Sequence, residues 1–189
     1  MKPPDPYASG VLSKDHHERL VADLENYARD AGITPQWICE PMPEMSEQVE
    51  TYMRRFRHHA NEGVVSGVCY SKRSKLPLPP DQYMSAMAGC LVRNFIRARV
   101  MTLGSVLDAC STRSLPNLSC LLIPNFFYPA AEGGTIASWQ ISTLHDLLVA
   151  RQVAGQQTNL YASDLTLLGK EYGLAFRELI DAHYIAAEG

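Results

Sequence analysis

The sequence predicts an α/β domain in which a mostly parallel sheet is covered by helices on both faces and preceded by two helices. Three observations support this fold class. Short apolar runs alternate with helical segments from residue 64 onward, and such an order requires crossover connections. The chain has 189 residues, of which 46% are apolar and 20% charged, as in a single globular domain. No internal repeat or low-complexity tract interrupts the pattern.

The first 62 residues are predicted to be a tail followed by helices. Residues 1–12 contain three prolines within six positions and are expected to form a mobile N-terminal tail. A helix is expected from Ser13 to Gly32, and a second helix from Pro43 to Asn61. We therefore divide the single domain over residues 13–189 into a helical part (13–62) and a core (63–184).

The core is predicted to alternate strands and helices. The expected strands cover residues 64–70, 99–103, 118–123 and 158–161, with Pro124 ending the third. The expected helices cover residues 80–96, 105–110, 141–148, 164–172 and 174–184. In an open α/β sheet a ligand normally binds at the carboxyl ends of the strands. The loops 71–80 and 124–136 and the segment 162–164 are therefore the places where a site is expected.

Charge is distributed unevenly along the chain. Residues 51–100 carry nine Lys and Arg against two Asp and Glu, whereas the segments on either side are acidic. A basic block indicates contact with phosphate or with an acidic partner, and internal pairing is the alternative. The DNA-binding candidates within this block are Arg54, Arg55, Arg57, Arg93, Arg97 and Arg99. The loop cations Lys72, Arg73 and Lys75 are candidates for binding a nucleotide or another phosphate, or form a solvated basic loop.

Cysteine use and hydropathy suggest a cytoplasmic protein. The five cysteines include no C-x-x-C pair and lie in apolar segments, so all five are expected to be reduced core residues. No signal-length apolar stretch follows the N-terminus, and no run of 18 apolar residues occurs, so no membrane insertion is expected.

Several segments resemble one class of ATPase. Residues 156–165 and 168–179 are similar to the strand, sensor segment and following helices of bacterial replicative-helicase loaders and of insertion-element ATPase subunits, which are AAA+ proteins. Residues 120–127 resemble their Walker B strand, and residues 49–70 resemble the helix and strand that lead to their Walker A loop. The resemblance covers about residues 45–182 and implies a P-loop core without a lid.

The resemblance fails at the groups that hydrolyse ATP. A P-loop needs glycines, a lysine and a Ser or Thr, but this chain has no glycine between Gly67 and its three loop prolines. Pro124 and Asn125 stand where the family has its two Walker B acids. The sensor position holds Ser163 and Asp164 rather than Asn, and the expected arginine is displaced to Arg177. ATP binding is conceivable for such a domain, but hydrolysis is not expected.

Other residue groups give weaker indications. Adjacent histidines at 16–17 and 58–59 point about 100° apart on a helix and do not predict a metal site. No G-x-S-x-G motif accompanies His145 and Asp146, so no catalytic triad is predicted. Phe126, Phe127 and Tyr128 cannot all point inward from a strand end. They are candidates for contacting a protein partner or for filling the nucleotide position.

The sequence leaves three functional hypotheses. The leading one is a non-hydrolysing AAA+-like regulator or inhibitor that binds the machinery of DNA replication, transposition or conjugative transfer, encoded by a mobile element such as a phage or plasmid. The second is an ATP-binding DNA-processing enzyme with a nonstandard nucleotide site. The third is a DNA-binding module that uses the basic block over residues 54–99. No catalytic residue is assigned under the leading hypothesis.

Overall fold

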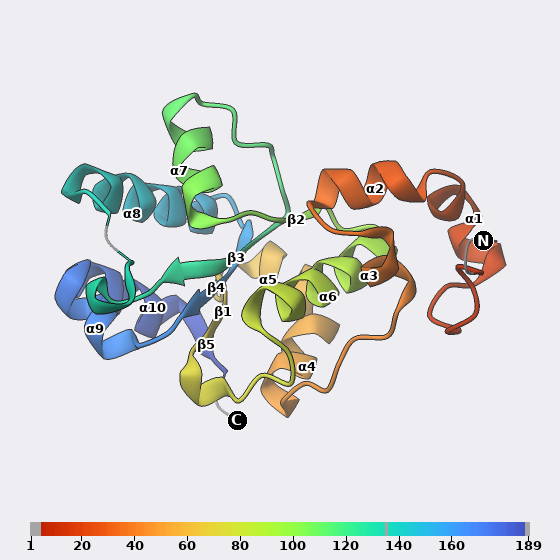
Figure 1. Ribbon diagram of the computed structural model, residues 1–189, viewed down its shortest axis with the longest axis horizontal. Coiled ribbons are helices and arrows are strands. Elements are labelled where there is room, and N and C mark those ends of the chain that lie inside the picture. Colours follow the sequence, from red (N-terminus) through yellow and green to blue (C-terminus); the bar gives the residue numbers. More distant parts are fainter. Residues whose placement is uncertain (1–4, 135, 188–189) are drawn as a thin grey trace.

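A computed structural model describes residues 5–134 and 136–187, and its centre is a five-stranded, all-parallel sheet (Figure 1). The strands are β1 (Gly67–Tyr70), β2 (Ala98–Val100), β3 (Cys120–Phe127), β4 (Gln157–Ala162) and β5 (Tyr184–Ala186). Their order across the sheet is β2-β3-β4-β1-β5. Every strand pairing within the described residues is parallel, so all strands end at the same edge of the sheet. This confirms the predicted α/β class and the parallel sheet.

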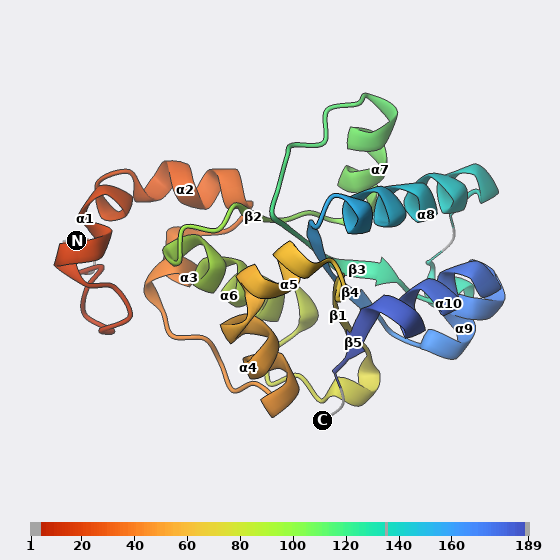
Figure 2. The same ribbon diagram turned by 180° about the vertical axis from the view of Figure 1, so that it is seen from behind.

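Helices cover both faces of the sheet, as predicted. The helices of the core are α6 (Pro80–Arg93), α7 (Leu103–Ser111), α8 (Ser138–Val153), α9 (Leu165–Glu171) and α10 (Leu174–His183). Residues of α7 to α10 form one buried cluster with Leu121, Ile123 and Leu160. Residues of α4, α5 and α6 form a second cluster with Val68 and Leu122 on the opposite face. Figure 2 shows the same two layers of helices from behind.

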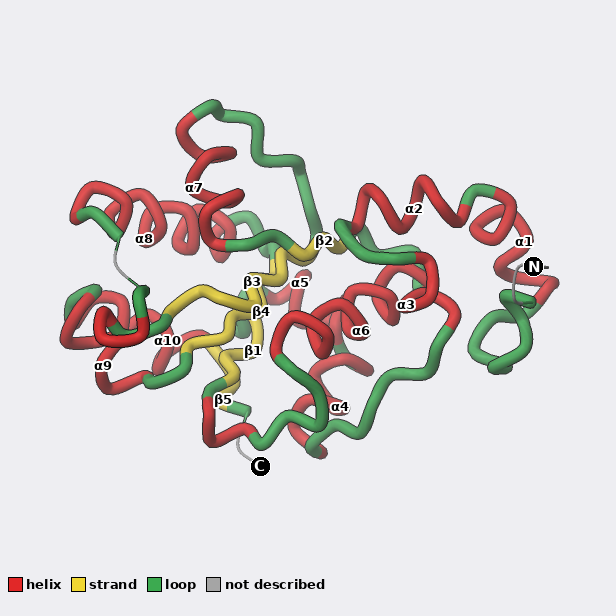
Figure 3. The backbone as a smooth tube through the Cα atoms, viewed as in Figure 1, coloured by secondary structure: helices red, strands yellow, loops and turns green. Residues whose placement is uncertain are grey.

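The N-terminal part is more helical than the sequence predicted. Instead of two helices it forms α1 (Lys14–Ala22), α2 (Leu24–Ala31), α3 (Pro35–Cys39), α4 (Glu47–Arg54) and α5 (Phe56–Glu62). Asp23 separates the first two helices and Arg55 separates the last two, and neither position carries a sequence signal for a break. Helix α1 lies at the end of the molecule farthest from α8 and α9, α2 leads back from it toward β2, and α3 packs against α6 (Figure 3).

The expected mobile tail is wrong for the described residues just before α1. Leu12 is buried in a cluster with Leu20 and Ile38, and Tyr7 and Val11 pack against that cluster. Apolar contact outweighs the effect of the prolines here because three side chains reach the same core. Residues 1–4 of the predicted tail lie outside the described residues.

Two strands differ from the prediction at their ends. β3 does not stop at Pro124 but continues to Phe127, with a register shift between Ile123 and Phe127 that accommodates the proline. The predicted last helix ends at Tyr184 and no fifth strand is expected, yet β5 (Tyr184–Ala186) pairs with β1 at the edge of the sheet. Three residues are too few for a period-2 pattern to distinguish a strand from a helix end.

Two glycines allow close backbone approaches that fix the layers. A Cβ at Gly67 would lie 1.9 Å from the carbonyl oxygen of Thr158, so β1 can meet β4 only with glycine there. A Cβ at Gly89 would lie 2.0 Å from the carbonyl oxygen of Trp37, so glycine lets α3 cross directly over α6. The N-terminal helices are therefore firmly packed against the core.

Candidate functional site

A cleft opens at the carboxyl edge of the sheet, where the sequence located a ligand site. Its volume is about 310 Å³, and it lies at the ends of β1, β4 and β5. The structure brings five candidate residues together on its walls: Lys72, Arg73, Ser163, Asp164 and Arg177. These residues lie up to about 100 positions apart in the chain, and parallel pairing of β1 with β4 brings their segments together.

The loop after β1 is a closed turn. The Ser71 amide donates to Ser74 Oγ at 2.8 Å, and the Arg73 amide donates to Ser71 Oγ at 3.1 Å. The Lys72 amide reaches the Ser163 carbonyl at 3.4 Å, and the Ser74 amide donates to the Ser71 carbonyl at 3.0 Å. A phosphate cradle needs consecutive amides that point at the ligand. These four amides donate to protein oxygens instead.

Two of the three cations of the cleft, Lys72 and Arg177, pair with carboxylates of the protein itself, whereas Arg73 forms no ion pair with a described residue. Lys72 Nζ lies 2.7 Å from Glu132 Oε1, and this hydrogen bond raises the pKa of the lysine. Arg177 Nε lies 2.7 Å from Asp181 Oδ2, one turn away on α10. The sequence did not identify Glu132 or Asp181 as partners. The i, i+4 spacing signals the Arg177 pair, but no local pattern signals a contact between residues 60 positions apart.

Asp164 is the N-cap residue of α9 at the wall of the cleft. Its carboxylate accepts hydrogen bonds from the amides of Thr166 (2.8 Å) and Leu167 (2.9 Å) and so caps the N-terminus of α9. The Leu167 amide has the largest effect in lowering the pKa of this carboxyl, followed among the stabilising contacts by the Thr166 amide. A carboxylate held in this way is a cap rather than a general base.

Two further side chains of the cleft are buried. The Ser163 hydroxyl has no hydrogen-bond partner among the described residues. Cys69 is fully buried, and burial raises the pKa of its thiol to about 12. The reactive form of cysteine is the thiolate, so this side chain is a core residue and not a nucleophile.

Pro124 and Asn125, which the resemblance aligns with a Walker B site, also have structural partners. Pro124 is buried inside β3, and Asn125 Oδ1 accepts a hydrogen bond from the Leu103 amide at 2.8 Å, tying β3 to the start of α7. The proposed partner contacts of Phe126 and Phe127 are wrong, because both side chains are fully buried and pack against Tyr172. The register shift in β3 lets two successive aromatics enter the core. Tyr128 is half-buried against Tyr161.

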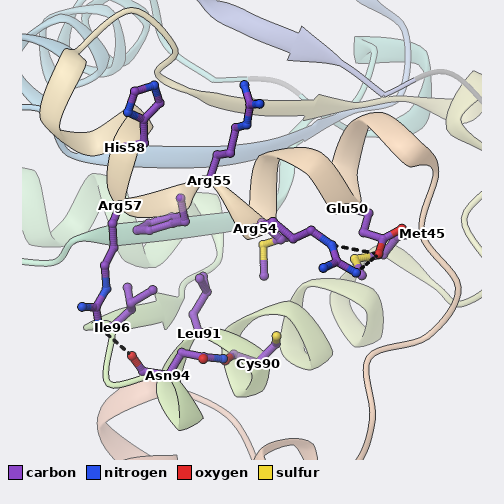
Figure 4. Close-up of a pocket in the computed structure, with 12 residues that line it drawn as sticks. Met45, Glu50, Arg54, Arg55, Arg57, His58, Cys90, Leu91, Asn94 and Ile96 are labelled. Atoms are coloured by element: carbon purple, nitrogen blue, oxygen red, sulfur yellow. Dashed lines mark hydrogen bonds and ion pairs between the residues drawn. The ribbon is translucent and has the colours of Figure 1, made fainter.

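The basic block divides into exposed and buried arginines at the opposite, amino edge of the sheet. A groove of about 680 Å³ between α4, α5 and α6 is lined by Arg54, Arg55 and Arg57 (Figure 4). Arg57 reaches the Asn94 carbonyl at 3.1 Å, Arg54 pairs with Glu50, and Arg55 points away from α6.

The remaining arginines of the block lie around the start of β2. Arg97 and Arg99 line a neighbouring hollow of about 470 Å³. Arg93 is a correction to the predicted DNA-binding set, because it is buried and donates to the carbonyls of Glu40 (2.7 Å) and Ile38 (3.4 Å). It fastens the segment after α3 to α6. Lys75, the third loop cation, adopts a left-handed conformation with φ 45° and lines a different pocket beside Tyr83.

The described residues contain neither a metal cluster nor a membrane span. Within residues 5–134 and 136–187, no three His, Cys, Asp or Glu side chains are grouped as a metal site would require. In the same part of the chain, no helix has the length and apolar character needed to cross a bilayer. Of the five cysteines, Cys69 and Cys120 are buried and the other three are half-buried.

The chain was compared with known proteins. No protein-family model matches the sequence, and no curated protein matches it.

Proposed function

We propose that the protein is a non-hydrolysing, AAA+-like regulator or inhibitor that acts by binding DNA-processing machinery rather than by turning over ATP. The observation that carries this proposal is the closed loop after β1, in which the amides of residues 71–74 all donate to protein oxygens. The segment occupies the position of a phosphate loop in the resemblance, but its donors have been redirected into a capped turn.

The charges of the cleft support the same proposal. Phosphoryl transfer depends on cations and metal ions that stabilise the charge developing on the transferred group. Here Lys72 is paired with Glu132, Arg177 with Asp181, and Asp164 caps a helix. Pro124 and Asn125 supply no carboxylate at the end of β3. A triphosphate bound here would have to compete with Glu132 and Asp181 for Lys72 and Arg177.

The proposed partners are proteins of replication, transposition or conjugative transfer, and the proposed source is a mobile element in whose host the protein is cytoplasmic. This part of the proposal is supported by the resemblance of residues 45–182 to helicase loaders and insertion-element ATPase subunits. The arrangement of the loop after β1 and the end of β3 at one edge of a parallel sheet is compatible with that resemblance. The ATP-binding enzyme remains the alternative that the first experiment tests.

The first experiment is a nucleotide titration. Thermal unfolding in the presence of millimolar ATP and Mg²⁺ is expected to show no rise in Tm, because a ligand that binds the native state would raise it. Phosphate release is expected to equal that of buffer. The Lys72→Ala variant and the control Lys170→Ala, which replaces an exposed lysine of α9 outside the cleft, are expected to behave alike. A Tm rise that Lys72→Ala abolishes and Lys170→Ala retains would refute the proposal in favour of the ATP-binding enzyme.

The second experiment concerns the partner. The tagged protein is used to capture proteins from host lysate with and without added ATP, and the captured proteins are identified by mass spectrometry. The expected result is capture of a replication, transposition or transfer protein that does not depend on ATP. Capture that requires ATP, or recovery of no such protein, would contradict the proposed regulator.

A further inference from the structure

The groove and the neighbouring hollow at the amino edge adjoin one another at the turn between α6 and β2. The groove is lined by residues of α4, α5 and α6, and the hollow by residues of α2, β2 and the segment before β3. Both include Ile96, which lies in the turn between α6 and β2. We call the combined surface the amino-edge groove and define it by Arg55, Arg57, Phe95, Ile96 and Arg97, with the other lining residues around them.

The amino-edge groove carries an excess of positive charge. Five arginines line it, against the two carboxylates of Glu50 and Asp30. Glu50 is engaged by Arg54, whose guanidinium lies 2.6 Å away. Arg57 donates to a backbone carbonyl, and Arg55 and Arg97 form no ion pair with any residue of the described chain. Exposed guanidinium groups without carboxylate partners attract phosphate.

An exposed aromatic side chain, Phe95, lines the hollow together with Arg97 and Arg99. Phe95 follows α6 with φ 59°, and 57% of its surface is exposed. Its amide donates to the Val92 carbonyl, and the next amide donates to that of Leu91, which makes Phe95 the left-handed residue that terminates the helix. Glycine is the usual residue at such a position, because a side chain is strained there. Phe95 thus places an aromatic ring on the surface at a position where its backbone conformation is strained.

A second aromatic side chain lies in the same hollow. Tyr27 of α2 is 39% exposed and lines the hollow together with Phe95. The Phe95 ring stacks on His17 of α1, with ring centroids 5.8 Å apart and planes 9° apart, so its orientation is fixed. The apolar spacing of the sequence places Tyr27 and Phe95 on the apolar sides of two helices and so predicts them as core residues. That prediction is wrong, because both side chains are exposed and α6 ends at Arg93, before Phe95.

Exposed arginines that follow a groove, combined with exposed aromatic rings, are the features by which proteins hold single-stranded nucleic acids: the cations contact the backbone and the rings stack on bases. We propose that the amino-edge groove binds single-stranded nucleic acid, with Arg57 and Arg97 on phosphates in the groove, Arg55 on a phosphate at its outer rim, and Phe95 stacked on a base. An acidic protein segment would use the arginines but would not need the ring. This site is separate from the carboxyl-edge cleft, so the proposal does not depend on whether the protein binds or hydrolyses ATP.

The test is fluorescence anisotropy with a labelled oligothymidylate of about 20 nucleotides, at about 50 and about 200 mM salt. We expect binding that weakens steeply with salt. The triple variant Arg55→Ala/Arg57→Ala/Arg97→Ala should weaken binding at least about tenfold and flatten the salt dependence. Phe95→Gly keeps the left-handed backbone and removes the ring, so it should weaken binding about fivefold or more with the salt dependence unchanged.

The control variant is Arg113→Gly. Arg113 has φ 53° and terminates α7 through the same pair of backbone hydrogen bonds, but it lies outside the groove. The change therefore removes both a cation and a strained side chain elsewhere, and it should leave binding unaltered. Equal Tm values for the variants show that folding is intact; a raised Tm for Phe95→Gly is also consistent with relief of strain.

Competitors decide the identity of the ligand. Unlabelled oligouridylate and oligothymidylate tell whether RNA or DNA is preferred, and either one supports the proposal. A duplex that competes as well as the single strand, or a polyglutamate peptide that binds with no effect of Phe95→Gly, would overturn it in favour of backbone-only or acidic-protein recognition. Absence of binding at the lower salt concentration would overturn it outright.

Discussion

The two edges of the sheet use polar side chains in opposite ways. At the carboxyl edge, the loop amides donate to neighbouring oxygens, Lys72 pairs with Glu132, and Asp164 caps a helix. At the amino edge, Arg55 and Arg97 are exposed and form no ion pair with any described residue, and Phe95 is held outward in a strained conformation. Sites that bind ligands keep donors and charges available, whereas structural sites satisfy them internally. The arginines that are available to a ligand therefore gather mainly at the amino edge, opposite the edge at which an α/β sheet usually binds its ligand.

The amino edge itself contains both buried arginines with structural hydrogen bonds and exposed arginines without ion pairs. The largest expected effect is the difference in stability when one arginine of each kind is replaced. Arg151 is buried and donates to Thr158 Oγ1 (2.8 Å), Gln156 Oε1 (3.0 Å) and the Gln157 carbonyl (2.7 Å). Burial lowers the pKa of this guanidinium. Arg151→Met leaves buried acceptors without donors and should lower the free energy of unfolding by about 2–4 kcal/mol. The methionine no longer carries the desolvation penalty of a buried charge, but this gain offsets only part of the loss.

Urea denaturation followed by circular dichroism measures this change. The matched substitution Arg97→Met replaces an exposed arginine and should alter the free energy of unfolding by less than about 0.5 kcal/mol. If Arg97→Met proved as destabilising as Arg151→Met, the distinction between structural and available arginines would be wrong.

The second prediction concerns the packing that supports the amino-edge groove. Gly89→Ala places a methyl group where the Trp37 backbone lies and should destabilise the protein by about 1–3 kcal/mol or more, because backbone on both sides cannot relax cheaply. Gly104→Ala in α7 meets no atom within 4 Å and should stabilise the protein by up to about 1 kcal/mol through helix propensity. Thermal or urea unfolding of the pair gives the comparison, and effects of the same sign would contradict the crossing of α3 over α6.

The sequence predicted β3 well because a buried parallel strand has a strong apolar signature, as at residues 120–123. The signature of β4 is weaker, since Gln157, Thr158 and Asn159 form its first half. The sequence also predicted which segments meet at the carboxyl edge, since this follows from parallel topology alone. It could not predict that Lys72 pairs with Glu132, because the two residues lie 60 positions apart in the chain and only the tertiary structure brings them together. The burial of Phe126 and Phe127 depends on a register shift, which alternation rules do not contain.

The amino-edge groove was only half predicted. The density of positive charge over residues 51–100 indicated an anionic partner, and the exposure of Arg54, Arg55, Arg57 and Arg97 agrees with it. The burial of Arg93 was not foreseeable, since it depends on where α3 lies relative to α6. The role of Phe95 follows from its backbone conformation, which no composition or periodicity rule encodes.

The third prediction tests the carboxyl edge as a structural site. Asp164→Ala should cost about 1 kcal/mol, because two amides of α9 lose their acceptor. The pKa of this carboxyl in the folded protein is lowered from 3.8. Its charge therefore stabilises the fold above that value, and the contribution is lost as the pH falls through the lower folded pKa.

Asp164→Asn separates the charge from the cap. Asparagine can still accept the amide hydrogen bonds, so its deficit should be smaller than that of alanine near neutral pH. The deficit should shrink further at about pH 3, below the ordinary carboxyl pKa of 3.8, because the wild type there loses part of the stabilisation that its charge provides. Urea unfolding at both pH values checks this. A deficit that grew on acidification would mean that Asp164 is not the charged cap described here.

The smallest expected effect belongs to the one buried hydroxyl of the carboxyl-edge cleft that has no partner among the described residues, that of Ser163. Ser163→Ala removes a polar group that gains nothing from burial, so it should leave stability unchanged or raise it by up to about 1 kcal/mol. If instead the hydroxyl binds a ligand, the variant should lose a Tm rise that the wild type shows with that ligand. Thermal unfolding with and without millimolar nucleotide distinguishes the two. A ligand-dependent difference would make the carboxyl edge a binding site and remove the contrast between the two edges.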